Sequence, residues 1–202
     1  MSNTITGPDG LARCRWSATA PEFPAYHDTE WGFPIGDDRR LFELMCLESF
    51  QSGLSWRTIL AKRENFRAAF RDFDFDQIAR FAPRDVERLL RNEGIVRHRG
   101  KIEAVINNAR RIRELIKREG SFAALVWRYE THAQPRTDRK PASTSLESVA
   151  LSKELRRLGW AFVGPTTVHA FRQATGLIND HAAGCAIRSK VERARRRFRP
   201  PK

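Results

Sequence analysis

The sequence predicts an all-α fold, and three observations support this prediction. Apolar residues recur at helical spacing along most of the chain, alternating strand patterns are almost absent, and no segment repeats another. The chain has 202 residues, of which 41% are hydrophobic and 30% charged, a composition typical of a globular protein that can enclose a core. Its longest apolar run, residues 122–127, is much shorter than the roughly 18 residues that a membrane span requires, so we expect no membrane association.

The helices follow one another after an irregular start. Residues 1–36 are rich in proline, glycine and aromatic residues, which predicts an ordered segment without regular structure that lies over the core. A helix should then begin at residues 37–38, with Leu41, Leu44 and Met45 on one face. The same spacing predicts further helices over residues 55–70, 75–81, 84–92, 101–118, 121–128, 146–158 and 165–175.

Two of these helices flank a short turn that is bounded by Gly94 and Gly100. A glycine-bounded turn that opens onto a helix N-terminus can direct backbone N–H groups at a phosphate, and Arg97, Arg99 and Lys101 add positive charge there. An ordinary helical hairpin with a solvated basic loop has the same spacing. The net charge of the chain favours the DNA-binding interpretation.

The charge of the chain favours a polyanionic partner. The formal net charge is +13 and the pI is about 10.7. Residues 188–202 contain eight lysines or arginines and a single acid, Glu192, so the remainder of the chain is basic as well. We expect residues 188–202 to be a disordered, solvated tail, whether or not they touch phosphates. Residues 131–145, which are polar and contain proline, predict a surface loop.

Cysteine and histidine residues near the two ends of the chain suggest a metal site. Three cysteines are an odd number at scattered positions, which argues against a disulfide framework. Cys14 and His27 near the start, with His181 and Cys185 near the end, form a Cys₂His₂ set that suits a closed, tetrahedral, structural zinc site. A capping histidine and a small buried cysteine would also account for each pair. Both pairs lie in segments that contain glycine and proline, outside the clearest helices, which strengthens the metal interpretation and leaves the alternative open.

Glu48 is the candidate for chemistry, because it takes the next place on the apolar face of its helix. An unpaired carboxylate there costs several kcal/mol unless something compensates it. It is therefore either paired, for instance with an arginine, or it serves a ligand. With Tyr26 and Trp56 it could hold a flipped purine, since aromatic faces sandwich the ring and the carboxylate accepts from the exocyclic amine. The alternative is that these aromatic residues belong to the core.

Seven strings, in order from Cys14 to Cys185, resemble the 3-methyladenine DNA glycosylase I family of the helix-hairpin-helix glycosylase superfamily. They are RCRW, YHDTEWG, LFELMCLES, QSGLSW, GIVRHRGKI, ALSKELRRLGWAFVGPT and NDHAAGC. The resemblance implies that a zinc ion joins the N- and C-terminal segments. It implies a base pocket of Glu48, Tyr26 and Trp56, with Trp16 and Trp31 close by.

The resemblance also assigns two DNA-binding segments and a domain plan. Gln51, Gly53 and Leu54 would face the lesion, and the turn from Gly94 to Lys101 would hold the backbone. Residues 1–187 would form one glycosylase domain, in which residues 36–130 form the helix-hairpin-helix lobe and residues 11–35 with 145–187 the zinc lobe.

Four positions depart from the family pattern. Ser49 and Phe50 follow the pocket glutamate, where the family usually has glycine next, and Phe23 and His169 stand where it has tyrosine.

The expected activity is DNA base-excision repair. A monofunctional glycosylase of this family hydrolyses the N-glycosidic bond of 3-methyladenine, an alkylated purine, in double-stranded DNA, without lyase activity. We expect a monomer in the cytoplasm, at the nucleoid of a bacterial cell, because the N-terminus carries no export signal. Two alternatives share some of these features: a non-catalytic helix-hairpin-helix DNA-binding module, and a zinc-stapled structural protein whose basic tail binds RNA. Release of free base from methylated DNA distinguishes a glycosylase from these two alternatives.

Overall fold

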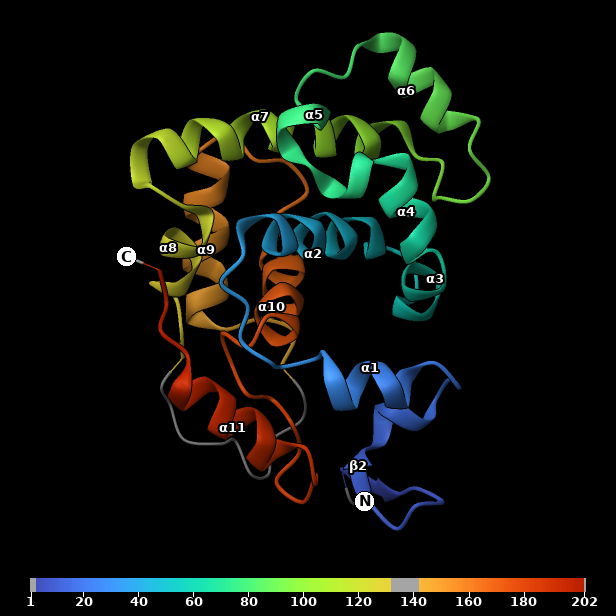
Figure 1. Cartoon of the computed structure of the whole chain (residues 1–202), viewed down its shortest axis with the longest axis vertical. Helices are drawn as coiled ribbons and strands as arrows, with labels where there is room; N and C mark the ends of the chain where they lie inside the picture. The colour runs from blue at the N-terminus through green and yellow to red at the C-terminus, as the bar shows by residue number, and fades with distance from the viewer. Residues whose placement is uncertain (1–2, 132–141, 202) are drawn as a thin grey trace.

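The computed structural model describes residues 3–131 and 142–201, and the predicted all-α fold is confirmed in them (Figure 1). Most of the loop predicted over residues 131–145 lies outside the described residues. None of the described helices is long and apolar enough to cross a membrane. The helices are α1 (Phe23–Thr29), α2 (Asp38–Gln51), α3 (Trp56–Ala61), α4 (Arg63–Ala69), α5 (Phe75–Ile78), α6 (Pro83–Leu90), α7 (Arg99–Glu119), α8 (Phe122–Trp127), α9 (Leu146–Arg157), α10 (Pro165–Ala174) and α11 (Arg188–Arg197).

The N-terminal segment contains more regular structure than the sequence predicts. Strands β1 (Thr4–Thr6) and β2 (Ala12–Cys14) pair antiparallel, with Thr4 opposite Cys14. Short 3₁₀ helices follow at η1 (Arg15–Ala18) and, later, η2 (Arg71–Phe73). Strands of three residues are too short to show an alternating pattern, so this hairpin leaves no periodic signal in the sequence.

Helix α2 lies in the centre of the helical part of the molecule (Figure 1). Its first turn is capped by the Asp37 side chain, which accepts from the backbone N–H of Arg40 at 2.8 Å. Every residue from Leu41 to Phe50 is buried. Helix α10 packs on α2 and also on α9. The helix is therefore buried on all sides and not only along the face that holds Leu41.

The helix predicted over residues 55–70 is divided into α3 and α4. The division falls at Lys62, which has non-helical backbone angles. Its side chain accounts for the break, because Nζ donates to the carbonyl oxygens of Glu93 and Gly94 at 2.9 and 3.3 Å. Lys62 thus fastens the α3–α4 junction to the turn between α6 and α7.

The expectation of a disordered C-terminal tail is wrong, because residues 188–197 form α11. Val191 is fully buried beside Cys14, Cys185 and Ile187, in a second, smaller core. After the helix, Phe198 packs on Trp127 with ring centroids 4.5 Å apart. Val191 and Phe198 therefore help to dock the helix, although the sequence around them is dominated by arginine.

Candidate active site

The four predicted metal ligands meet in one buried cluster. Cys14 is the last residue of β2, His27 lies on α1, and His181 and Cys185 lie before α11. Nδ1 of His181 is 3.1 Å from Nε2 of His27, and Sγ of Cys185 is 3.5 Å from both nitrogens. Sγ of Cys14 is 3.7 Å from Nδ1 of His181, and all four ligand atoms lie within 4.8 Å of one another.

This donor set fits a tetrahedral metal ion. Zinc bound by two imidazole nitrogens and two thiolates at its usual bond lengths separates the nitrogens by about 3.3 Å, and nitrogen from sulfur by about 3.5 Å. The second nitrogen of each histidine is also held, because Nδ1 of His27 lies 2.7 Å from Asp28 Oδ1 and Nε2 of His181 lies 3.1 Å from the carbonyl oxygen of Trp31. Such partners fix which nitrogen faces the ion. The cluster could therefore hold zinc.

Beside the cluster lies a cavity of about 640 Å³ with one aromatic side. Trp16, Tyr26, Trp31 and Trp56 all line it. The rings of Tyr26 and Trp56 are 5.6 Å apart, and those of Trp16 and Trp31 are 5.0 Å apart and meet edge to face. The indole Nε1 of Trp56 has no hydrogen-bond partner among the described residues. The structure thus brings together the aromatic residues of the predicted base pocket.

Glu48 lines the same cavity, and its surroundings differ from those of Glu43 on the same helix. Glu43 and Glu48 are each 5% exposed. Glu43 Oε1 accepts from Arg67 Nε at 2.7 Å, so it is the satisfied buried glutamate that the alternative interpretation describes. Oε2 of Glu48 has no partner within the described part of the chain. Burial raises the pKa of Glu48 to about 8.

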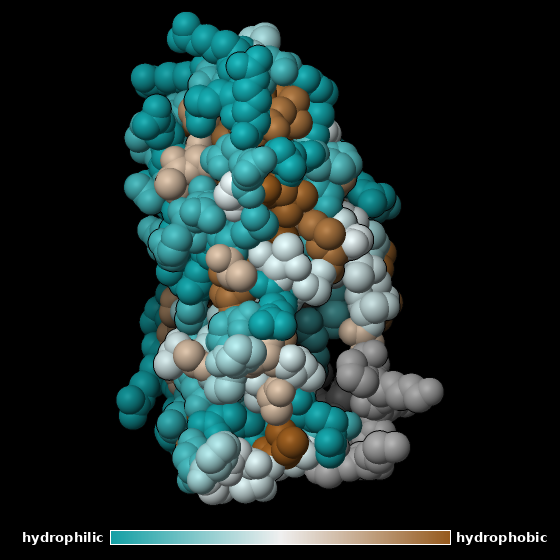
Figure 2. All heavy atoms as spheres, turned by 90° about the vertical axis from the view of Figure 1, so that its right-hand side faces the viewer, coloured by the Kyte–Doolittle hydropathy of each residue, from teal (hydrophilic) through white to brown (hydrophobic). Residues whose placement is uncertain are grey.

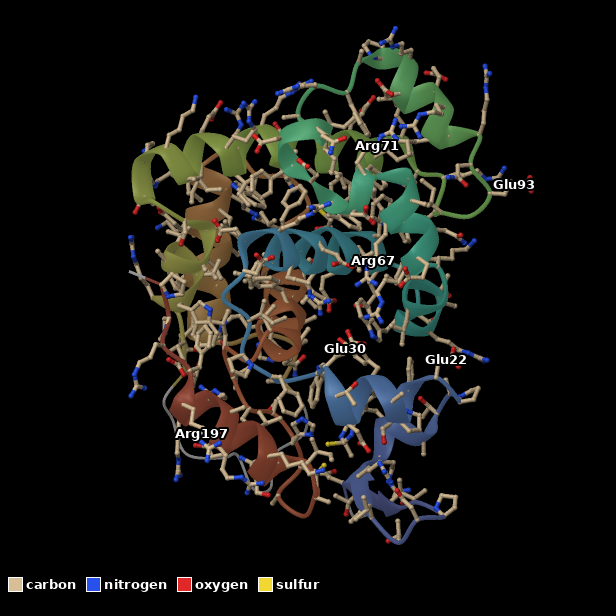
Figure 3. The ribbon with its side chains drawn as sticks, in the orientation of Figure 1. Glu22, Glu30, Arg67, Arg71, Glu93 and Arg197 are labelled. Atoms are coloured by element: carbon tan, nitrogen blue, oxygen red, sulfur yellow. The ribbon has the colours of Figure 1, made fainter. Side chains whose placement is uncertain are left out.

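The opposite wall is held in place by two ion pairs at the ends of α1. Glu22, Tyr26 and Glu30 are four residues apart, so they lie on one side of this helix. Glu30 accepts two hydrogen bonds from Arg63 at 2.6 and 3.0 Å, and Glu22 accepts one from Arg57 at 2.8 Å (Figure 3 labels both glutamates). These pairs fasten α1 to α3 and α4, and Tyr26 is thereby set against Trp56. Burial and the nearby Glu48 carboxylate raise the pKa of Tyr26 well above its usual value.

The predicted lesion-facing residues form the turn at the end of α2. Gln51 lines the cavity, whereas Gly53 and Leu54 are exposed beyond it. Gly53 has a φ of +80°, a conformation that favours glycine, and no atom lies within 4 Å of an added Cβ. The backbone of this turn is therefore accessible to a large ligand.

Lys101 does not lie where the sequence analysis places it. The residue is 6% exposed, and its Nζ donates to the carbonyl oxygens of Phe50 and Ser52 at 2.9 and 2.5 Å. Burial lowers its pKa. The expectation that Lys101 adds charge to the surface of the turn is wrong, because the side chain points inward and closes the C-terminal end of α2.

The turn between α6 and α7 has its predicted form, but its two exposed arginines are paired with acidic residues. An added Cβ at Gly94 would lie 3.0 to 3.1 Å from the side chains of Asn92 and Asn65, which would have to shift by a few tenths of an ångström. At Gly100 it would make only ordinary contacts, 3.4 Å and beyond. Arg97 and Arg99 are exposed, with side chains 52% and 51% accessible. Arg99 pairs with Glu87 and Glu103, and Arg97 with Glu93 at 3.6 Å. The face that carries α3 and α6 is mostly hydrophilic (Figure 2).

The four positions that depart from the family pattern lie in different places. Phe50 is buried in the core against Phe66, and Ser49 Oγ lies 3.0 Å from the carbonyl oxygen of Phe162. Phe23 packs edge to face on Trp16 at 5.6 Å. Of these four positions, only His169 is among the described residues that line the cavity.

A second side of the cavity is polar, and the sequence analysis does not predict it. Gln173, Asn179, Asp180 and Arg188 line it, with Arg15. Asp180 accepts from the amide of Gln173 at 2.6 Å, and Nδ2 of Asn179 donates to the carbonyl oxygen of Arg188 at 3.1 Å. Isolated polar residues at helix ends and in loops carry no spacing pattern. Asp28, which orients His27, is missed for the same reason.

The chain is similar to known proteins of one family. The model of the methyladenine glycosylase family matches residues 16–189. The chain is 47% identical over 181 residues to DNA-3-methyladenine glycosylase 1 of Escherichia coli, an alignment that covers 87% of this chain and 96% of that protein. It is 39% identical to DNA-3-methyladenine glycosylase of Haemophilus influenzae, over 88% of this chain and 98% of that one. A crystal structure of a 3-methyladenine DNA glycosylase I superposes with a TM-score of 0.79 at 48% identity, covering 86% of this chain and 98% of that chain.

Proposed function

The chain belongs to the methyladenine glycosylase family, and on this basis we propose that it removes 3-methyladenine from DNA by hydrolysing the N-glycosidic bond, a step of base-excision repair. One observation supports this above all. The carboxylate of Glu48 is buried in a cavity with aromatic walls, and its Oε2 has no partner among the described residues. A cationic purine would supply the missing charge and the missing hydrogen bond.

The chemistry of the lesion explains why binding can provide most of the selectivity. Methylation at N3 gives the adenine nucleotide a positive charge and makes the base a good leaving group. Flipping the nucleotide costs a few kcal/mol, less for a damaged base. The rings of Tyr26 and Trp56, which are 5.6 Å apart and too close to enclose a stacked base between them, then contact the base from one side, while Glu48 stabilises its charge in a poorly solvated site. Water attacks C1′ of the sugar as the bond to the base breaks.

The proposed reaction is hydrolysis alone. No lysine is among the described residues that line the cavity, and Nζ of Lys101 is bound by two carbonyl oxygens at the end of α2. A Schiff base with the sugar requires a free amine within reach of C1′. We therefore propose a monofunctional glycosylase without lyase activity.

We propose zinc as the ion of the Cys14, His27, His181 and Cys185 cluster. Such an ion would act structurally, joining the N-terminal segment that carries Tyr26 to the C-terminal segment. The four ligands complete a closed tetrahedral set, which keeps no open position for a substrate. Asp28 and the Trp31 carbonyl would keep the histidines oriented.

The proposed substrate is double-stranded DNA that contains alkylated bases, bound by a monomer. We propose that the turn between α6 and α7 is the hairpin of a helix-hairpin-helix motif and contacts the phosphate backbone. The exposed Arg97 and Arg99 and the N-terminus of α7 support this role. A chromosomal substrate would place the protein at the nucleoid.

The test of the proposed function is the release of free base from methylated DNA. Duplex DNA treated with a methylating agent is incubated with the protein in excess, and released bases are separated by chromatography. We expect 3-methyladenine in the soluble fraction, with abasic sites left in an unbroken strand. Binding of DNA without release of base would favour the non-catalytic DNA-binding module.

The pH dependence of excision should follow Glu48. Because burial raises its pKa to about 8, the carboxylate of the free protein is mostly protonated at pH 7, and its ionised form becomes abundant as the pH rises. We expect kcat/KM to rise about tenfold from pH 7 to pH 9, levelling off above the pKa. Single-turnover rates across this range measure the effect, and a profile that stays flat would contradict it.

Arg97 should contribute to binding through phosphate contact. Each phosphate contact that is lost changes the slope of log K against log salt concentration by about 0.9. We expect Arg97→Ala to reduce the slope by about this amount, measured by fluorescence anisotropy on an undamaged duplex. Lys101→Met is the matched control, because it removes a buried charge: it should lower thermal stability and leave the slope unchanged. Equal slope losses in both variants would show that Lys101 also contacts the phosphate backbone.

A further inference from the structure

Helix α11 begins at the wall of the cavity and extends beyond the part of the chain that matches the family. Its first residue, Arg188, lines the cavity, and the family match ends at residue 189. From there the helix continues to Arg197, which Figure 3 labels at the lower left. Nearly all of α11 therefore lies outside the family match, and its N-terminal end lies at the wall of the proposed base pocket.

Three inward contacts fix the orientation of this helix. Val191 is fully buried, and the Arg188 guanidinium donates to the carbonyl oxygen of His181. Arg195 is 11% accessible, and its Nη2 donates to Glu130 Oε1 and to the carbonyl oxygen of Thr131 at 2.8 and 2.9 Å. Because these anchors all lie on one side, the opposite side of α11 is held toward solvent.

That outward side is a basic stripe formed by Lys190, Arg193 and Arg197. The three residues are exposed and stand at i, i+3 and i+7, so they follow one face of the helix over about 10 Å. Within the described residues none of them forms an ion pair. Their neighbour Arg196, by contrast, lies 3.4 Å from Glu192. The stripe thus presents a fixed row of three cations that no acidic group of the described residues compensates.

We propose that this basic stripe binds the phosphate backbone of duplex DNA. A row of about 10 Å spans roughly three base-pair steps of one strand. The cavity at the N-terminal end of α11 would receive a nucleotide that remains joined to its duplex. The stripe has no aromatic side chain on which an unpaired base could stack, which favours duplex DNA over single-stranded RNA. This inference rests on the proposed function, because it takes DNA as the substrate.

The experiment measures the salt dependence of DNA binding by the full chain. A triple variant, Lys190→Ala with Arg193→Ala and Arg197→Ala, is compared with the unaltered protein on an undamaged duplex, by anisotropy at several sodium chloride concentrations. Three lost phosphate contacts should reduce the slope of log K against log salt by about 2.7. We also expect affinity at low salt to fall at least tenfold, and KM for methylated DNA to rise more than kcat falls.

A control variant removes the same charge elsewhere. Lys117→Ala, Arg118→Ala and Lys153→Ala change exposed residues on α7 and α9, outside the cavity. If the stripe binds DNA, the slope changes far more in the first variant than in the control. Equal slopes in the two triple variants would overturn the proposal, as would a larger loss for single-stranded RNA than for duplex DNA.

Two further measurements separate this proposal from the proposed function. Thermal melting and zinc content of the triple variant should match those of the unaltered protein, because Arg188, Val191 and Arg195 are kept. Base release by the unaltered protein tests the glycosylase activity on its own. Absence of base release would refute the function, whereas a normal release with an unchanged salt slope in the triple variant would refute only the role of α11.

Discussion

Replacing Glu48 with glutamine should lower excision of 3-methyladenine by about 10²- to 10³-fold, the loss that follows when one preorganised electrostatic partner is removed from an enclosed site. Glutamine keeps the size of the side chain and one acceptor oxygen, and it removes the charge that a cationic base requires. The fold should persist, since Glu48 has no ion-pair partner to lose among the described residues. Affinity for undamaged DNA should change little. Single-turnover excision and binding of free 3-methyladenine measure the two losses.

Glu43→Gln is the matched control for this experiment. Glu43 stands on the same helix at the same exposure, yet it is paired with Arg67, which Figure 3 labels. Its replacement should lower the melting temperature, because it leaves the guanidinium of Arg67 without its buried partner, and should leave excision by the folded protein nearly intact. The opposite pattern, in which Glu48→Gln lowers stability and spares excision, would overturn the assignment of Glu48 to the base pocket.

Disruption of the proposed zinc site should have the largest effect on stability. Purified protein should contain about one zinc per chain, and Cys14→Ser or His181→Ala should lose it, because each removes one of four ligands. Structural zinc contributes folding free energy directly, and one kcal/mol corresponds to about 2 to 4 °C for a chain of this size. We expect the melting temperature to fall by at least about 10 °C. Elemental analysis and thermal unfolding measure the two effects.

Cys46→Ala provides the control for the cysteine variant. Cys46 is as buried as the cluster cysteines but lies on α2, outside the cluster. This variant should keep its zinc and lose only the stability that a small core truncation costs. Zinc retained at full occupancy in both cluster variants would show that the four residues do not form the metal site.

The sequence is most informative where one helix supplies many equivalent positions. Regular spacing predicts α2, α7, α9 and α10 to within a few residues, because each buries a long face. It also identifies Glu48, since a carboxylate among apolar residues is an exception that a pattern can reveal. The division of residues 55–70 at Lys62 is invisible to such a pattern, because it depends on a contact with residues 93 and 94.

The wrong expectations for Lys101 and for residues 188–202 both involve long cationic side chains. Lysine and arginine are expected at the surface, yet Lys101 reaches inward to close the end of α2, and Arg188 and Arg195 anchor α11. Their aliphatic stems pack like apolar residues while the charged end finds carbonyl oxygens. Composition alone cannot separate these anchoring residues from the solvated ones beside them. Burial, which depends on the whole fold, decides between them.

The distribution of the cluster ligands along the chain sets the order in which the protein can become active during its synthesis. His27 and His181 are 154 residues apart, and Tyr26 is made at the start of that interval. At about 5 to 20 residues per second, roughly 8 to 30 seconds pass on the ribosome before the second pair of ligands exists. During that time α1 can form, but nothing ties it to the C-terminal segment. The nascent chain should therefore be unable to hold a flipped base until its translation is almost finished.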